Sequence, residues 1–391
     1  MPVIDKVDEF KMMFNGVKDP VGIFDFCGVN AERALTEKSK DAELVEKLNQ
    51  FLDGQFFTSH SIDRLARVVG EGTDIIRLAK VGYRGSIYML NESVDQFAEL
   101  SEAIGFPKEI IQQYVSDTAS HYSRFFIWKD EAKTKKRWIE APDDTLKQMQ
   151  EAILRNILYK IAPTKFAHGF ICGRSIVTCA KAHTGKKFVL KLDLKNFFPS
   201  ITREMLLGAM APYINESNFK FVLPAMELCL MEGRLPQGAP TSPAASNIVA
   251  RQLDLLMYGI SSQFGCEYTR YADDLIFSSN ERDIYTMIPI IKKAIAKFGL
   301  VVNEKKVKVL KSHQRQTVTG LVVNSDGQTS VARRKRMKLR AFIHHILTGR
   351  YPLDRVNFAR LKGNITFIAM ANPNQGRWFL EKWDEIQAMR G

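Results

Sequence analysis

The sequence predicts an α+β fold, and three observations support this prediction. Residues 266–277 read as two β-strands joined by a turn, at which Asp273 and Asp274 stand side by side. The alternation of apolar side chains before Asp193 predicts a further buried strand, which ends at this carboxylate. Segments 143–159 and 331–349 place apolar side chains at helical spacing. The chain therefore combines short strands with amphipathic helices.

Composition limits the class of protein. A chain of 391 residues suggests two or three packed lobes, and 45% hydrophobic with 25% charged residues is ordinary for a soluble globular protein. The net charge of +13 indicates a polyanionic partner, although ribosomal, membrane-surface and chromatin proteins share this property. The five cysteines form no Cys-x-x-Cys pair and indicate reduced thiols rather than a disulfide or zinc framework. No apolar run approaches ~18 residues and no signal segment opens the chain, so we expect a cytoplasmic protein without a membrane partner.

The adjacent carboxylates of Asp273 and Asp274 suggest a metal site. Neighbouring side chains on an extended strand point to opposite faces, so the two are not expected to be equivalent. Two ionised carboxylates repel each other unless a cation neutralises them, and oxygen ligands without nearby His or Cys favour Mg²⁺ over zinc. An exposed turn is the simpler interpretation, but the apolar flanks and the third carboxylate, Asp193, argue against it. One Asp on a strand beside two on a hairpin suits a pair of metals ~3.5–4 Å apart for in-line phosphoryl displacement.

Three motifs occur in an order that is typical of one enzyme family. They are Asp193 at a strand end, Leu-Pro-Gln-Gly-Ala-Pro-Thr-Ser-Pro at 235–243, and Tyr-Ala-Asp-Asp at 271–274. Together they resemble the palm of reverse transcriptases, and segments 168–170, 180–183, 269–275, 318–320 and 338–349 resemble the bacterial retron type. The resemblance covers about residues 121–371 and implies a right-hand polymerase with fingers, palm and thumb. It also implies two Mg²⁺ ions, held by Asp193, Leu194, Asp273 and Asp274.

Residues 1–120 read as a helical N-terminal extension that lies outside the recognisable polymerase. Segments 65–84 and 100–124 echo each other weakly, each as a short helix, a Gly turn and a second helix. A packed helical scaffold is the preferred interpretation, and a helix-turn-helix that touches nucleic acid is the alternative. Residues 1–100 are the best candidate for docking a partner.

Residues 121–330 are predicted to form the fingers and palm. Segments 125–128 and 137–140 would pair as two strands around a polar loop, and such a hairpin can fold over a nucleotide and clamp its triphosphate. The resemblance assigns triphosphate contact to Arg137, which begins an Arg-x-Ile-x-x-Pro pattern ending at Pro142. Lys129 and Lys133 in the loop are expected to be solvated.

Two segments before Asp193 are predicted to contact nucleotide or nucleic acid. Arg174 would approach the incoming nucleotide or the template backbone, and a structural salt bridge is the alternative. Residues 179–183 match the retron-specific Asn-Ala-x-x-His segment except at Cys179, whose thiol cannot replace the two donors and the carbonyl of an amide. His183 is predicted to bind RNA, with a satisfied structural histidine as the alternative.

Residues after Asp193 are predicted to recognise the incoming nucleotide. Phe198 resembles the aromatic steric gate that excludes a 2'-hydroxyl, so we expect a preference for deoxynucleotides; core packing is the alternative. Phe197 is counted with the nucleotide-binding candidates, although we expect it to pack inward. Gln237 and Gly238 form a turn where backbone can approach the nucleotide closely. Helices are expected at 205–230 and 246–260.

The segment after the Asp pair is predicted to complete the palm. A helix at 285–298 leads through a turn into a strand at 299–303. Of the adjacent Lys305 and Lys306, we choose Lys305 as the lysine that helps protonate departing pyrophosphate, and a charged strand end is the alternative. Thr319 and Gly320 resemble the hairpin that holds the primer end, and residues 324–327 form a hairpin turn.

Residues 331–391 are predicted to form a helical thumb. Between 331 and 349, apolar side chains at helical spacing accompany six basic residues. This pattern suits a helix that packs on one side and follows a phosphate backbone on the other, and a merely solvated face is the alternative. The nucleic-acid-binding candidates are Arg333, Arg334, Arg336 and Arg340.

These features predict deoxynucleotidyl transfer templated by RNA, with dNTPs as substrates. The resemblance to retrons implies a dedicated structured noncoding RNA as template and primer, a start from a 2'-hydroxyl in that RNA, and a branched RNA–DNA product (msDNA). By analogy with retron systems we expect a separate effector protein and a role in phage defence. One alternative is another bacterial reverse transcriptase, from a non-retron defence system or a mobile element. Another is a non-catalytic RNA-binding scaffold.

Overall fold

The structure of the protein is a computed structural model that describes residues 96–128, 133–210, 213, 219–281 and 284–389. The predictions for residues 1–95, including the first of the two echoing segments, lie outside these residues. The described chain forms two compact units. One contains the described parts of Met1–Thr164 and Lys195–Gln263 together with Ala294–Leu300, and the other contains Lys165–Leu194 and the described parts of Phe264–Lys293 and Val301–Gly391. None of the described helices is both long and apolar enough to cross a membrane.

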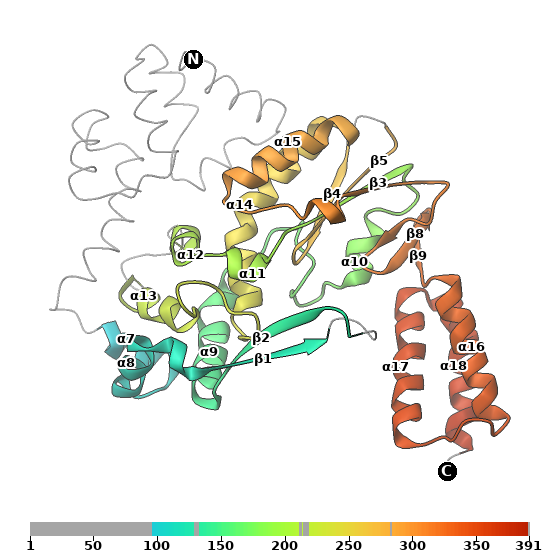
Figure 1. The fold of residues 1–391 in the computed structure, drawn as a ribbon, viewed down its shortest axis with the longest axis horizontal. Helices are drawn as coiled ribbons and strands as arrows, with labels where there is room; N and C mark the ends of the chain where they lie inside the picture. The colour runs from blue at the N-terminus through green and yellow to red at the C-terminus, as the bar shows by residue number, and fades with distance from the viewer. Residues whose placement is uncertain (1–95, 129–132, 211–212, 214–218, 282–283, 390–391) are drawn as a thin grey trace. The chain divides into compact units, whose positions relative to one another are not determined.

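The first unit combines one β-hairpin with several helices. Helices α7 (Gln96–Ile104) and α8 (Lys108–Ser116) meet at Gly105, whose φ of 75° suits glycine. This confirms the helix, glycine turn and helix predicted in the second echoing segment. The hairpin follows as β1 (Tyr122–Trp128) and β2 (Lys136–Pro142), which confirms the two predicted finger strands (Figure 1).

Helix α9 (Asp144–Asn156) is the amphipathic helix predicted at 143–159. Asp143 caps it, because its carboxylate accepts the backbone N–H of Leu146 at 2.8 Å. Leu146, Met149 and Ile153 on one side of the helix are fully buried. The helical spacing of the sequence therefore identified the side that packs.

Four further helices complete the described core of this unit. They are α11 (Phe197–Ser200), α12 (Arg203–Met210), α13 (Phe219–Leu228) and α14 (Ser242–Gln263). The segment 205–230 was predicted to be helical, and its described residues contain two separate helices, α12 and α13. Helix α14 contains the segment predicted at 246–260, and four of its apolar side chains are buried: Ile248, Leu253, Leu256 and Met257.

The second unit is built on a four-stranded antiparallel sheet with the strand order β4-β5-β3-β6 (Figure 1). Its strands are β3 (Phe188–Asp193), β4 (Glu267–Tyr271), β5 (Asp274–Ser279) and β6 (Lys308–Lys311). The pairing of β3 with β5 sets Asp193 opposite Asp274. The strand predicted at 299–303 is wrong, because only Val302 forms a bridge there, with Leu194. The sheet is completed instead by β6, in which only two of four residues are apolar.

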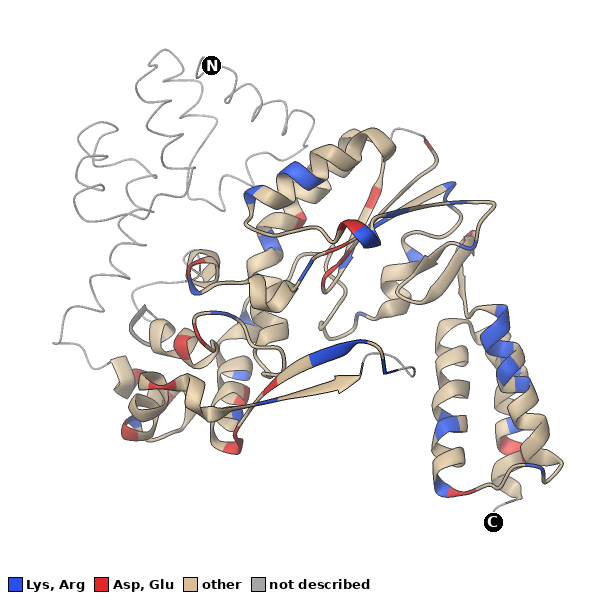
Figure 2. Cartoon of the chain, viewed as in Figure 1, with Lys and Arg blue, Asp and Glu red and all other residues tan. Residues whose placement is uncertain are grey.

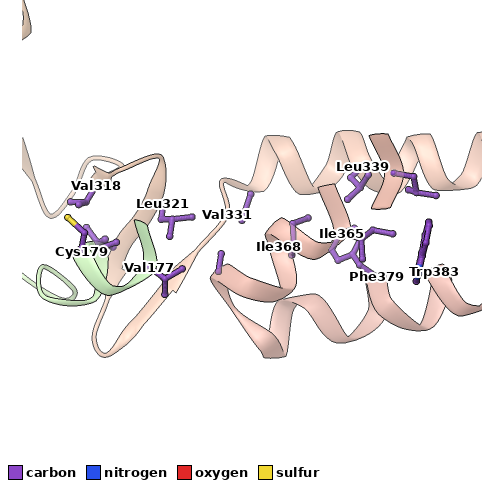
Figure 3. Packing of buried hydrophobic residues seen from close by; sticks show 14 of the residues in the cluster. Val177, Cys179, Val318, Leu321, Val331, Leu339, Ile365, Ile368, Phe379 and Trp383 are labelled. Atoms are coloured by element: carbon purple, nitrogen blue, oxygen red, sulfur yellow. The ribbon is translucent and has the colours of Figure 1, made fainter. Parts of the chain in front are cut away.

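Smaller elements surround one continuous core in the second unit. They are α10 (Ile176–Lys181), α15 (Ile284–Lys297, which ends in the first unit), a sheet of β7 (Thr317–Val318), β8 (Leu321–Ser325) and β9 (Gln328–Ser330), and the helices α16 (Arg333–Leu347), α17 (Arg355–Ala371) and α18 (Pro373–Ala388). They confirm the predicted helices at 285–298 and after 331, and the hairpin turn at 324–327. One cluster of buried side chains runs from Val177 in α10 through Leu321 and Val331 to Ile365 and Phe379 (Figure 3).

Candidate active site

The three predicted metal-binding carboxylates lie at one end of the four-stranded sheet. Asp193 ends β3 and is almost wholly buried, with 6% of its surface exposed. Asp274 begins β5 directly opposite, and Asp273 occupies the turn between β4 and β5. The backbone N–H of Leu194 donates to the Asp273 carbonyl at 2.9 Å, which ties the end of β3 to this turn. The structure therefore brings together the residues that the sequence predicted from separate motifs.

The turn that carries the Asp pair is held in an uncommon backbone conformation. Ala272 has a φ of 55°, a left-handed value that costs energy for a residue other than glycine. The buried guanidinium of Arg270 donates to the Ala272 carbonyl at 3.2 Å. A Cβ atom at Gly169 would lie 2.7 Å from the Ala272 nitrogen, so only glycine fits beneath the turn. The predicted segment 168–170 therefore has a structural role in supporting the carboxylates.

Asp193 is paired with a lysine. Its Oδ2 accepts from Lys306 Nζ at 2.6 Å, and its Oδ1 accepts from Asn303 Nδ2 at 3.0 Å. Lys305 and Lys306 are both exposed, and the hydrogen bond to Asp193 raises the pKa of Lys306. The lysine that the structure places at the carboxylates is Lys306, the neighbour of the lysine chosen from the sequence. The adjacent lysines both stood out in the sequence, whereas nothing in it singled out Asn303.

Negative charge accumulates at the carboxylates. The pKa of Asp274 is raised to about 6, chiefly by burial, and the negative charges of Asp273 and Asp193 contribute to this rise. Lys191 and Lys306 oppose this rise because their positive charges favour the ionised form. A carboxyl group with this pKa is easily protonated, so the site attracts cations and protons alike.

The carboxylates have the donor chemistry that suits Mg²⁺, since each supplies hard oxygen ligands. Among the residues that the structure describes, however, no three His, Cys, Asp or Glu side chains converge closely enough to enclose an ion. The Lys306 ammonium supplies the positive charge beside Asp193. The residues thus fit a divalent cation by their chemistry, and a cation bound at Asp193 Oδ2 would replace Lys306.

The nucleotide candidates of the first unit differ in their exposure. Arg137 lies on the exposed part of β2, opposite Ile127 in β1. Phe197 is buried, as expected, whereas Phe198 is half-buried with its ring centroid 5.7 Å from that of Phe197. The aromatic side chain of Phe198 therefore retains a surface that a ligand can reach, and Phe197 belongs to the core.

The turn at Gln237 and Gly238 is fastened to β2 by Glu140. The carboxylate of Glu140 accepts two hydrogen bonds from Arg234, at 2.7 and 3.0 Å, and one from the Gln237 backbone at 3.2 Å. The Glu140 backbone N–H donates to the Gln237 carbonyl at 3.0 Å. A Cβ atom at Gly238 would lie only 2.4 Å from the Glu140 carbonyl oxygen. The close backbone approach predicted at Gly238 is made to β2, and sequence reasoning missed the role of Glu140.

His183 lies in the interior. Its ring is fully buried, with Nδ1 2.7 Å from Ser278 Oγ and Nε2 2.7 Å from Thr269 Oγ1. Cys179 is also buried and contacts the same Thr269 hydroxyl through its sulfur at 3.2 Å. These contacts fasten α10 to the sheet. They favour the structural interpretation of His183 over RNA binding, because no part of the ring reaches the surface.

The other second-unit candidates fall into structural and exposed groups. Arg174 donates to the Ala167 carbonyl, and the Thr319 hydroxyl donates to the Ile176 carbonyl at 2.9 Å. Gly320 is exposed in the turn between β7 and β8, with a φ of 86°. In Figure 2, the blue stretches of the ribbon mark the Lys and Arg positions along α16.

The four α16 arginines are not equivalent. Arg333 and Arg334 are exposed, whereas Arg336 donates to the Val331 carbonyl at 3.1 Å. The Arg340 guanidinium lies 4.9 Å from the centroid of the Trp378 ring in α18, a cation–π contact within the helical bundle. Arg333 and Arg334 are therefore the two whose side chains are best placed to meet a ligand.

Comparison with known proteins identifies the family. The model of the family described as "Reverse transcriptase (RNA-dependent DNA polymerase)" matches residues 127–323, which include all three aspartates. The chain belongs to the reverse transcriptase family. Retron Mx162 reverse transcriptase of Myxococcus xanthus is 32% identical to it over 330 residues, covering 75% of this chain and 68% of that protein. Retron Ec86 reverse transcriptase of Escherichia coli is 32% identical over 294 residues, covering 75% of this chain and 90% of that protein.

These relatives confirm the predicted retron type, α+β polymerase fold and enzyme class. The reverse transcriptase is an RNA-directed DNA polymerase. Among solved structures, a foamy viral protease-reverse transcriptase in complex with double-stranded DNA aligns at 16% identity with a TM-score of 0.37, over 63% of this chain and 36% of that one.

Proposed function

We propose that this reverse transcriptase copies a structured noncoding RNA into single-stranded DNA, starting from a 2'-hydroxyl within that RNA. The product is a branched RNA–DNA molecule (msDNA). The observation that carries the proposal is the 32% identity to more than one retron reverse transcriptase over three quarters of the chain. A role in phage defence with a separate effector protein, in the cytoplasm, follows from the same likeness.

The carboxylates are proposed to hold two Mg²⁺ ions with Asp193, Leu194, Asp273 and Asp274 as the ligands. Bound there, the ions would lower the pKa of the attacking hydroxyl and stabilise the charge that develops on the phosphate. The hydroxyl oxygen forms a bond to the α-phosphorus of the dNTP, and the bond to the leaving pyrophosphate breaks. Lys306, which already pairs with Asp193, is the residue that we assign to protonating the pyrophosphate in place of Lys305.

Recognition of the nucleotide is proposed for residues that match the family's motifs. Phe198 would exclude a 2'-hydroxyl on the incoming sugar, and Arg137 would bind the triphosphate as a planar, bidentate donor. Gln237 and Gly238 would contact the nucleotide through their turn, and Arg174 has a lesser part because it is engaged with the Ala167 carbonyl.

Nucleic-acid contacts are proposed for the second unit. Thr319 and Gly320 would support the primer end, and the exposed arginines of α16 would follow a phosphate backbone. We propose residues 121–330 as fingers and palm and 331–391 as thumb. Residues 1–120 are proposed as an N-terminal extension, of which residues 1–100 dock a partner.

The experiment purifies the chain with its co-expressed nucleic acid, treats it separately with RNase and DNase, and sequences what remains. A discrete single-stranded DNA joined through a 2'–5' branch to one RNA is the expected result. Heterogeneous linear DNA would retain the polymerase and exclude the retron product. RNA without DNA, even with dNTPs and Mg²⁺ supplied, would favour a non-catalytic scaffold. The Asp273→Asn, Asp274→Asn double variant is the control that should yield RNA alone.

A further inference from the structure

A pocket lies at the end of the four-stranded sheet that is opposite the aspartates. Its volume is about 610 Å³, within the ~300–1,000 Å³ typical of ligand sites. Phe188 begins β3 at the pocket and Asp193 ends the same strand, so roughly 16 Å of extended chain separates the two sites. The lining residues are Lys187, Phe188, Tyr285, Lys311, Ser312 and His313. The pocket is therefore distinct from the carboxylate site.

The lining of the pocket is basic. Lys187 and Lys311 supply two cationic side chains and His313 can supply a third, and none of the six lining residues is acidic. Lys311 in β6 lies directly opposite Phe188 in β3, so strand register sets the two side chains on the same face of the sheet. Such a lining attracts an anion, and phosphate is the anion that the enzyme's nucleic-acid partners carry.

Two aromatic rings lie among these positive charges. The centroids of Phe188 and Tyr285 are 6.1 Å apart with their planes at 76°, and Tyr285 is 41% exposed. An exposed aromatic ring beside cationic side chains is the combination that binds single-stranded nucleic acid, because bases stack on the ring while phosphates meet the charges.

Both walls of the pocket are held in place by amide side chains, those of the buried Gln316 and the exposed Asn324. Gln316 is fully buried, and its Nε2 donates to the carbonyls of Lys186 at 3.0 Å and Lys187 at 3.2 Å. The same nitrogen donates to the Leu310 carbonyl at 3.1 Å, which joins the wall at residues 186–187 to β6. On the other wall, Asn324 Nδ2 donates to the Ser312 carbonyl at 3.0 Å. A site whose walls are fixed in advance loses little entropy when a ligand binds.

We propose that this pocket binds an unpaired nucleotide of a single-stranded polynucleotide. Its base stacks on Tyr285, and its phosphates lie beside Lys187, Lys311 and His313. The proposal rests on the nucleic-acid partner of the proposed function and adds a contact away from the polymerisation site. RNA and DNA strands share this chemistry, so each is tested separately.

The test is photocross-linking of the full chain to a single strand that carries 5-iodouracil, as RNA and as DNA, followed by mapping of the cross-linked peptides. A cross-link at Tyr285 or Phe188 is expected, and the strand that gives it identifies the source. In fluorescence anisotropy, the Tyr285→Ala variant should bind that strand at least about fivefold more weakly than the wild type, given the typical value of base–aromatic stacking. The Lys187→Glu, Lys311→Glu variant should bind still more weakly.

A charge-matched control distinguishes the loss of contacts in the pocket from a general loss of electrostatic attraction between the protein and the strand. The Lys147→Glu, Lys160→Glu variant makes the same change in net charge at two exposed lysines of the first unit and should bind nearly as the wild type does. The pocket variants should keep the wild-type melting temperature and extend a pre-annealed primer on its template at the wild-type rate.

Two results would overturn the proposal. One is a wild-type chain that binds the strand and extends primers but gives no cross-link in the pocket. The other is a stable pocket variant that loses primer extension together with binding, because the pocket would then belong to the polymerisation site. A wild-type chain that makes no DNA at all would instead contradict the proposed function. A cross-link at Tyr285 would still support nucleotide binding in the pocket in that case.

Discussion

At the residue scale, two adjacent lysines show how one position changes a side chain's role. Both side chains are exposed, and Lys306 is the one that donates to the Asp193 carboxylate, at 2.6 Å. Both residues lie in the short 3₁₀ turn Glu304–Lys306, where consecutive side chains leave in different directions. The pairing also explains how the protein tolerates a nearly buried carboxylate, since a buried charge is costly unless it is neutralised.

Lys306→Ala should slow deoxynucleotide addition much more than Lys305→Ala. If Lys306 delivers a proton to pyrophosphate, its loss should lower kcat by about 10²-fold, the lower end of the range for general acid catalysis. Single-nucleotide primer extension at saturating dNTP measures the effect. Equal rates for the two variants would exclude the assignment of Lys306.

His183→Asn should change how stability depends on pH. In the folded protein, burial lowers the pKa of His183 to about 3, whereas in the unfolded chain it returns to about 6.5. Between these values the unfolded state binds a proton that the folded state does not, so this residue's contribution to stability is lost as the pH falls through the window. At pH 5 the loss is about 2 kcal/mol.

Urea unfolding at pH 7.5 and pH 5 measures this effect. The wild type should lose about 2 kcal/mol more than the His183→Asn variant over that interval, because asparagine does not titrate. An identical pH dependence in the two proteins would mean that the ring can be protonated in the folded state, and the buried network would have to be revised.

At the element scale, β2 and the Gln237–Gly238 turn behave as one piece. Glu140 is 7% exposed, and its carboxylate accepts hydrogen bonds from Arg234 and from the Gln237 backbone N–H. Its own backbone N–H donates to the Gln237 carbonyl. The hairpin that carries Arg137 therefore has its base fixed to the turn that is predicted to meet the nucleotide. Glu140 is therefore assigned a positioning role, because it holds β2 and the Gln237–Gly238 turn together.

Gly238→Ala should force β2 away from this turn. The new Cβ would lie 2.4 Å from the Glu140 carbonyl oxygen, an overlap that we expect to cost about 1–3 kcal/mol and to raise the KM for dNTP. Gly208→Ala in α12 is the matched control, because its Cβ would meet nothing within 4 Å and should stabilise the helix by about 0.5–1 kcal/mol. Chemical unfolding compares the two, and equal effects would contradict the close approach.

The sequence predicted local elements better than contacts between distant segments. Apolar alternation identified β3, and helical spacing identified the buried side of α9, because both patterns lie within one element. Glu140 was missed because its partner Arg234 lies 94 residues away, and nothing near Glu140 in the sequence marks the pairing. The interior position of His183 depends on hydroxyl groups in β4 and β5, which a linear pattern cannot bring together. The matched motifs found the three aspartates because their order is a property of the family.

At the scale of the whole molecule, the contribution of the net charge of +13 to nucleic-acid binding depends on which cationic side chains can reach phosphate. Arg333, Arg334 and Arg340 are all exposed on α16, but the guanidinium of Arg340 lies over the Trp378 ring of α18. Each of these arginines carries the same formal charge. Only the arginines whose side chains approach the phosphate backbone displace the counterions of a nucleic acid.

The Arg333→Ala, Arg334→Ala variant should bind primer–template with a weaker dependence on salt. Each lost phosphate contact reduces the slope of log K against log salt by about 0.9, so the pair should reduce it by about 2. Arg340→Ala should leave the slope nearly unchanged but lower the melting temperature, because it removes packing on the Trp378 ring. Titrations over a series of salt concentrations distinguish them, and a steep slope in the double variant would exclude these contacts.

The buried cluster shared by α10, β7–β8 and α16–α18 determines how this enzyme can exchange parts with its relatives. A chimera that takes residues 331–391 from another reverse transcriptase would set foreign side chains against Val177 and Leu321, which stay behind. The C-terminal helices therefore depend for their packing on the short helix α10, which lies about 150 residues earlier in the chain. A transplant that carries 176–181 and 317–388 together should be more stable than one that carries 331–391 alone, since it moves Val177 and Leu321 together with the helices that they pack against.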